Sequence, residues 1–124
     1  MRTMLAIAAG GACGALLRWW VAQGVYALAG RGFPFGILVV NVAGSLAMGV
    51  VYVVFFERFE IPSEWRAALV VGFLGAFTTF STFSMDTLLL IQQGDHAKAG
   101  MNVVLSVVLC IAGCWLGMAA ARQF

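Results

Sequence analysis

Long stretches without a charged residue dominate this chain of 124 residues. Three of them, residues 32–56, 67–85 and 99–121, contain 25, 19 and 23 residues. A helix of about 20 mostly apolar residues is long enough to cross a bilayer. Each of these stretches therefore predicts one membrane-spanning helix.

The N-terminal region predicts a fourth span. Residues 3–17 and 19–30 are uncharged and are separated only by Arg18, so together they are long enough to cross the membrane. A cleavable signal peptide is the alternative, but no small-x-small cleavage site with polar sequence follows. We expect one all-α transmembrane domain over residues 1–124. Its four spans are expected at about residues 3–29, 34–56, 66–93 and 97–121.

Short loops connect these spans, and two of them contain helix-start signals. Pro34 stands where a proline is tolerated in the first turn of the second helix. Ser63, which follows Pro62, is predicted to be the N-cap of the third helix.

The composition agrees with a membrane protein and excludes several other classes. Hydrophobic residues make up 63% of the chain and charged residues 10%, against about a quarter charged in soluble domains. The net charge of +2 is spread singly, without the basic run of a nucleic-acid-binding domain. Three cysteines give no disulfide framework. We therefore expect function within the membrane or at its faces.

Basic residues set only a weak preference for orientation. With four spans, Arg2, Arg58, Arg66 and Arg122 fall on one side, and Arg31 and Lys98 on the other. Orientation follows the excess of basic residues in the cytoplasmic loops. So small an excess is compatible with insertion in both orientations and antiparallel pairing.

Two polar residues stand out inside the first two spans, because polar groups at membrane depth are unfavourable unless they have a role. Arg18 either snorkels to the headgroups beside Trp19 and Trp20 or lines an aqueous vestibule that attracts anions. Asn41 either bridges two helices or donates an N–H group to a permeating anion.

The third span contains the strongest signal, five hydroxyl residues within seven positions (78, 79, 81, 82 and 84), interleaved with phenylalanines. At helical spacing Phe80 and Phe83 share one face, and Thr79 and Thr82 share an adjacent one. Such a segment can break the helix and free carbonyls for a cation. Paired phenyl rings also present electropositive edges that suit a small anion. The alternative is hydroxyl back-bonding in a packed helix.

Further polar residues follow in the sequence. Asp86 is the only carboxylate well inside an apolar stretch, and is either neutral, paired with Arg18 or another cation, or near a vestibule. A mildly polar stripe on the fourth helix consists of Asn102, Ser106, Cys110 and Cys114. No histidine or further cysteine is near the two thiols in the sequence, which favours packing over metal binding.

Three segments resemble the CrcB/Fluc family of bacterial fluoride channels. They are residues 10–19 (GGACGALLRW), residues 36–44 around Asn41, and above all residues 72–84 (GFLGAFTTFSTFS). The resemblance extends over nearly the whole chain in length, number of spans and motif order. It implies a passive channel that exports toxic cytoplasmic fluoride across the inner membrane of a bacterial cell.

The resemblance also implies an antiparallel, dual-topology homodimer of four-helix subunits with two pores and a broken third helix. Phe80 and Phe83 resemble the phenylalanines whose ring edges contact fluoride. Asn41 resembles the family's pore asparagine and Arg18 its vestibule arginine.

A structural sodium ion on the two-fold axis is implied as well, with the carbonyls of Gly75 and Thr78 as its ligands. The residues that match, or lie near, the family's polar track beside the rings are Thr79, Ser81, Thr82 and Ser106.

Three departures from the family pattern are present. Ala76 stands where the family often has a second glycine, and Asp86 replaces the usual glutamate. Cys110 and Cys114 occupy positions expected to hold serine and threonine, so this half of the track is expected to be less polar.

Other classes of protein are less compatible with the sequence. A small multidrug-type exporter needs an acid in the first span, which here has Arg18 instead. A membrane subunit without transport activity leaves the hydroxyl–phenylalanine cluster without a purpose. An enzyme is not expected, because no nucleophile, base and orienting group occur together.

Overall fold

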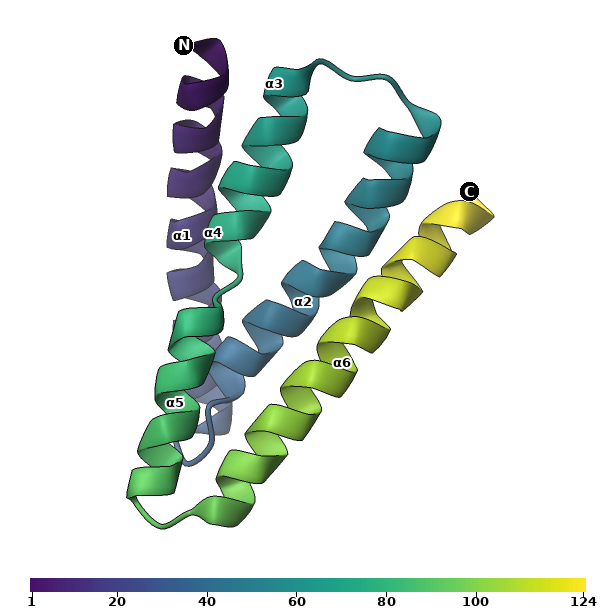
Figure 1. Ribbon diagram of the computed structural model, residues 1–124. Coiled ribbons are helices and arrows are strands. Elements are labelled where there is room, and N and C mark those ends of the chain that lie inside the picture. The colour runs from purple at the N-terminus through teal and green to yellow at the C-terminus, as the bar shows by residue number, and fades with distance from the viewer.

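Helices are the only regular secondary structure in the computed structural model, which describes all 124 residues (Figure 1). Four helical spans are long and apolar enough to cross a membrane, by their length and composition, as expected of a multi-pass membrane protein. They are Arg2–Ala29, Phe35–Arg58, Ser63–Gln92 and His96–Gln123.

The four spans differ in their regularity. The first and last are the continuous helices α1 (Arg2–Ala29) and α6 (His96–Gln123). In the second span, α2 (Phe35–Tyr52) continues into a π-helical segment, η1 (Val53–Arg58). The third span has four parts, in order α3 (Ser63–Arg66), the π-helical η2 (Ala67–Leu74), α4 (Gly75–Phe77) and α5 (Phe80–Gln92).

The start of the third span differs from the prediction at one residue. Helix α3 begins at Ser63 itself, and the cap position belongs to Pro62, whose φ of −54° and ψ of 145° turn the chain into the helix. The Ser63 side chain makes no capping hydrogen bond, so its prediction as N-cap was wrong. The fixed φ of proline sets the direction in which the chain enters the helix, and no side chain caps the first turn.

Two helix pairs hold the bundle together, α1 with the first part of the third span and α2 with α6 (Figure 1). The second pair depends on glycines. A Cβ at Gly49 would overlap the carbonyl oxygen of Cys114, and one at Gly117 would overlap that of Leu46. Small residues allow this backbone-to-backbone approach, which is the usual basis of helix association in membranes.

The buried interior of a single chain is small. Only 21 of 124 residues are buried, and one core cluster consists of Ala22, Val40 and Phe77. Large apolar side chains are exposed on every span. Most of the apolar surface is therefore available to lipid or to another chain.

Candidate functional site

The third span is interrupted at two residues in its middle. Thr78 (φ −89°, ψ 155°) and Thr79 (φ −151°, ψ 115°) have extended backbones and separate α4 from α5. In Figure 1 this interruption is the short non-helical connection between α4 and α5.

The side chain of Asn41, on α2, binds both backbone polar groups of Thr79. Its Nδ2 donates to the Thr79 carbonyl at 3.0 Å, and its Oδ1 accepts from the Thr79 N–H at 2.8 Å. A buried backbone group without a partner is unfavourable, most of all where water is scarce. Asn41 therefore bridges two spans and stabilises the interruption.

Thr79 also organises the hydroxyl cluster. Its Oγ1 accepts from the backbone N–H of Thr82 at 3.1 Å and so caps the N-terminus of α5. The same oxygen donates to Thr82 Oγ1 at 3.1 Å and lies 3.2 Å from Ser81 Oγ. The alternative of hydroxyl back-bonding describes Thr78 and Ser84, which donate to the carbonyls four residues earlier, but not these three residues.

A groove of about 410 Å³ lies beside the interruption, between α2, α5 and α6. Phe80 and Phe83 both line it, and their ring centroids are 5.4 Å apart at an interplanar angle of 44°. The Phe80 side chain is 78% exposed in a single chain. No lysine, arginine, aspartate or glutamate is among the lining residues, which are Asn41, Gly44, Ser45, Met48, Thr78, Thr79, Phe80, Phe83, Ser106, Val107, Cys110, Ile111 and Cys114.

Ser106 is the polar residue that α6 contributes to this groove. It is 7% exposed, and its Oγ is buried without a hydrogen-bond partner. Asn102, one turn earlier, instead donates to Thr87 Oγ1 at 2.9 Å. Buried hydroxyls normally have partners, and Ser106 is an exception that leaves a free polar group at the groove. Asn102, in contrast, connects α6 to α5.

Six predicted site residues, Thr78 included, thus meet at one groove, and the other four, Gly75 among them, do not line it. Ser81 and Thr82 do not line the groove and reach it only through Thr79. Arg18 is half-buried on α1 and is not a lining residue. Sequence reasoning missed Met48, because a methionine in an apolar span gives no signal of a site.

Two backbone carbonyls near the interruption lack the amide donors of a continuous helix. The N–H of Thr79, which would donate to the Gly75 carbonyl, binds Asn41 instead. The N–H of Thr82, which would donate to the Thr78 carbonyl, binds Thr79 Oγ1. Free carbonyl oxygens are suitable ligands for a hard cation, so these residues fit a sodium ion.

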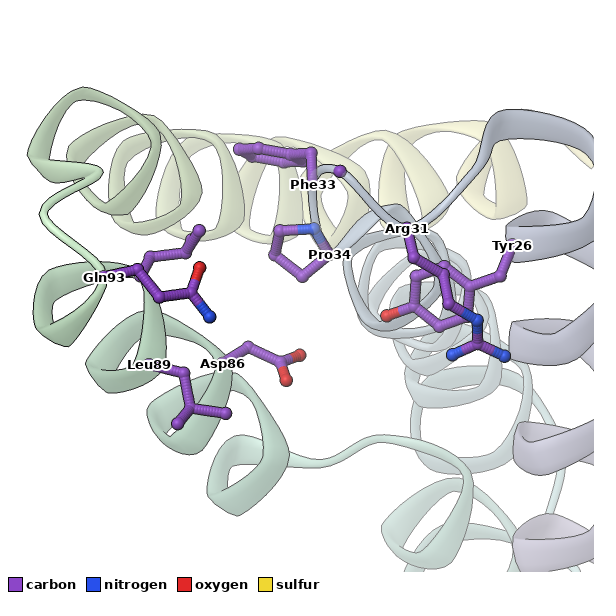
Figure 2. A pocket seen from close by; sticks show the side chains of 9 residues that line it. Tyr26, Arg31, Phe33, Pro34, Asp86, Leu89 and Gln93 are labelled. Carbon is purple, nitrogen blue, oxygen red and sulfur yellow. The ribbon is translucent and has the colours of Figure 1, made fainter.

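Asp86 lines a second cavity of about 220 Å³ near the loop between α1 and α2. Figure 2 shows its carboxylate pointing from α5 into this space, toward Tyr26 and Arg31. The Oδ2 atom is buried without a partner, and Asp86 forms no ion pair with Arg18. Arg31 donates instead to Gln23 Oε1 at 2.9 Å, with its guanidinium 4.6 Å from the centroid of the Tyr26 ring.

These features define a small multi-pass membrane protein with an uncharged groove of aromatic and polar side chains beside a helix interruption. The sequence profile described as "CrcB-like protein, Camphor Resistance (CrcB)" matches residues 5–118. The chain belongs to the CrcB family. The curated relatives below are named as ion channels rather than enzymes, as expected.

Curated relatives are identical to this chain at about half of the aligned residues. A protein of Methylococcus capsulatus is 54% identical over 98% of this chain, which spans about half (53%) of that relative. A protein of Pseudoalteromonas translucida is 50% identical over 94% of this chain and 98% of its own. One of Geobacter sulfurreducens is 49% identical over 99% of both. Each is named "Fluoride-specific ion channel FluC".

Replacing Asn41 with leucine is expected to destabilise the fold. The change leaves the N–H and C=O groups of Thr79 without their partners, and each buried unsatisfied group costs about 1–3 kcal/mol. We expect the melting temperature in detergent, followed by circular dichroism, to fall by at least about 5 °C. Ser84→Ala is the matched control, because this exposed hydroxyl binds only a carbonyl of its own helix. Equal melting temperatures for the two variants would contradict the bridging role of Asn41.

Proposed function

We propose that this protein is a passive, fluoride-selective ion channel and that the groove beside Phe80 and Phe83 is part of its permeation pathway. The observation that carries the proposal is the buried, unpartnered hydroxyl of Ser106 in the same uncharged groove as the two rings. The names of the relatives support the identity of the ion. Their similarity also supports a bacterial inner membrane as the location.

The groove offers the type of contact that a small, strongly hydrated anion needs. Ser106 Oγ is free to donate a hydrogen bond. The amide nitrogen of Asn41 has two hydrogens, of which one binds the Thr79 carbonyl and the second is left for an anion. The edges of Phe80 and Phe83 are electropositive. Together these groups replace part of the hydration shell of fluoride.

The absence of charged lining residues makes the groove suitable for conduction. An ion that permeates must bind well enough to enter and weakly enough to leave. Neutral donors and ring edges satisfy both conditions, whereas a lysine or arginine would hold the anion. The hydroxyls of Ser81 and Thr82 hold the Thr79 side chain in place at the pathway. Arg18 is proposed to attract anions to the vestibule of the channel.

A second, antiparallel copy is part of the proposal, because one chain leaves the groove open. Phe80 is 78% exposed and Gly75 is also exposed, so another chain has room to cover the interruption. The weak bias of basic residues between the two membrane faces supports dual topology. In such a homodimer the Gly75 and Thr78 carbonyls of both copies would hold a sodium ion, which would supply a fixed positive charge at the interface.

Efflux from liposomes tests the function directly. The purified protein is reconstituted into liposomes loaded with potassium fluoride or potassium chloride, and ion release after addition of valinomycin is followed with ion-selective electrodes. We expect rapid fluoride release and no chloride release above that of protein-free liposomes. Equal rates for the two halides would reject a fluoride-selective channel.

Cross-linking tests the homodimer and the sodium ion together. Glutaraldehyde treatment in mild detergent is expected to give a dimer band when sodium is present. Replacing sodium with a large organic cation is expected to weaken this band and lower the melting temperature, because the facing carbonyls lose the cation that they coordinate. A strictly monomeric protein that conducts fluoride would contradict the shared interface.

A further inference from the structure

Three sulfur-containing side chains line one part of the groove. Cys110 and Cys114 lie on α6 and Met48 lies on α2, and all three are half-buried. Both cysteines are free thiols. Residues four apart on a helix share one face, with Cβ atoms about 5–6 Å apart. The two thiols therefore face the same space.

Close packing of α2 on α6 brings the backbone next to Met48 to the level of Cys114. Gly49, the next residue after Met48, packs directly against the carbonyl oxygen of Cys114. The sequence spacing of the cysteines shows no third ligand, but the tertiary structure adds a thioether from another span. A set of two thiols and one thioether selects soft metal ions.

We propose that Cys110, Cys114 and Met48 form a binding site for a soft, thiophilic metal ion such as Ag(I) or Cu(I). On binding, each thiol releases its proton to solvent and forms a sulfur–metal bond, and the ion gives up its water ligands. The groove has no carboxylate or imidazole among its lining residues, and two thiols supply only half of the four ligands of a structural Zn(II) site.

A consequence for transport follows, and it rests on the proposed function. The sulfur site lies in the same groove that Phe80, Phe83 and Ser106 line. A metal ion held there occupies the space beside the rings. Soft metal ions therefore inhibit fluoride conduction, and a thiol competitor such as dithiothreitol restores it.

Silver nitrate in chloride-free buffer is the probe, and Cys13 provides the matched control. Cys13 is an exposed thiol on α1, outside this groove. Silver retained by the purified protein after desalting is measured by mass spectrometry. Cys13→Ser is expected to retain one silver ion per chain, and Cys13→Ser combined with Cys110→Ser or Cys114→Ser is expected to bind silver at least about tenfold more weakly. Met48→Leu tests the thioether and should weaken binding while both thiols remain.

Fluoride efflux is measured on the same variants. Silver is expected to slow efflux at least about tenfold in Cys13→Ser. In the triple variant, which combines Cys13→Ser, Cys110→Ser and Cys114→Ser, silver is expected to leave the efflux rate as it is without silver. Pair-dependent silver retention in a protein without fluoride flux would uphold the metal site and reject the channel. Silver retention that persists without Cys110 and Cys114 would overturn the site, even if fluoride flux is rapid. Equal inhibition of Cys13→Ser and the triple variant would also overturn it.

Discussion

Replacing Phe80 or Phe83 with isoleucine is expected to lower the rate of fluoride efflux at least about 100-fold. Both rings line the groove, with their centroids 5.4 Å apart. Isoleucine keeps an apolar side chain of considerable size but lacks the electropositive ring edge that attracts an anion. A 100-fold loss corresponds to about 2.7 kcal/mol of lost stabilisation along the pathway.

Phe59→Ile is the matched control for this experiment. Phe59 lies between the second and third spans, is 62% exposed and does not line the groove. All three variants are reconstituted at equal protein density, and their efflux is followed with the fluoride electrode. Wild-type rates in Phe80→Ile and Phe83→Ile would show that fluoride does not pass the rings.

Replacing Gly49 and Gly117 together with alanine is expected to cause the largest loss of stability. Each new Cβ would overlap a backbone carbonyl on the facing helix, that of Cys114 or that of Leu46. A backbone atom cannot turn away as a side chain can, so α2 and α6 must separate. Overpacking at one site costs about 1–3 kcal/mol, and we expect the double variant to be recovered largely as unfolded or aggregated protein.

Gly100→Ala makes the same substitution on α6 where no atom lies near the added methyl group. Alanine has a higher helix propensity than glycine by about 1 kcal/mol, so this control is expected to be as stable as the wild type or slightly more stable. Size-exclusion profiles and thermal melts in detergent measure both effects. A double variant that elutes and melts like Gly100→Ala would show that α2 and α6 do not meet through these glycines.

The sequence alone determined the number and the approximate ends of the spans. A bilayer requires about 20 apolar residues for each crossing, and charged residues interrupt the chain between such stretches. The observed spans begin and end within three residues of the predicted ones. The hydroxyl–phenylalanine segment was also visible from sequence, because Ser and Thr are unusual at such density in an apolar span. Most of the predicted pore residues follow from this segment and from the single asparagine of the second span.

Only the tertiary structure decided which of these residues meet. Asn41 and Thr79 are 38 positions apart, and their paired hydrogen bonds depend on how α2 lies against the interrupted third span. Met48 has no polar group to mark it in sequence, yet it lines the same groove as two thiols, and its neighbour Gly49 closely approaches the Cys114 carbonyl. Hydropathy describes the affinity of a segment for lipid, which is a local property. Contacts between spans depend on the shapes of the facing helix surfaces and on where backbone polar groups lack partners. Both are defined only once the helices have packed.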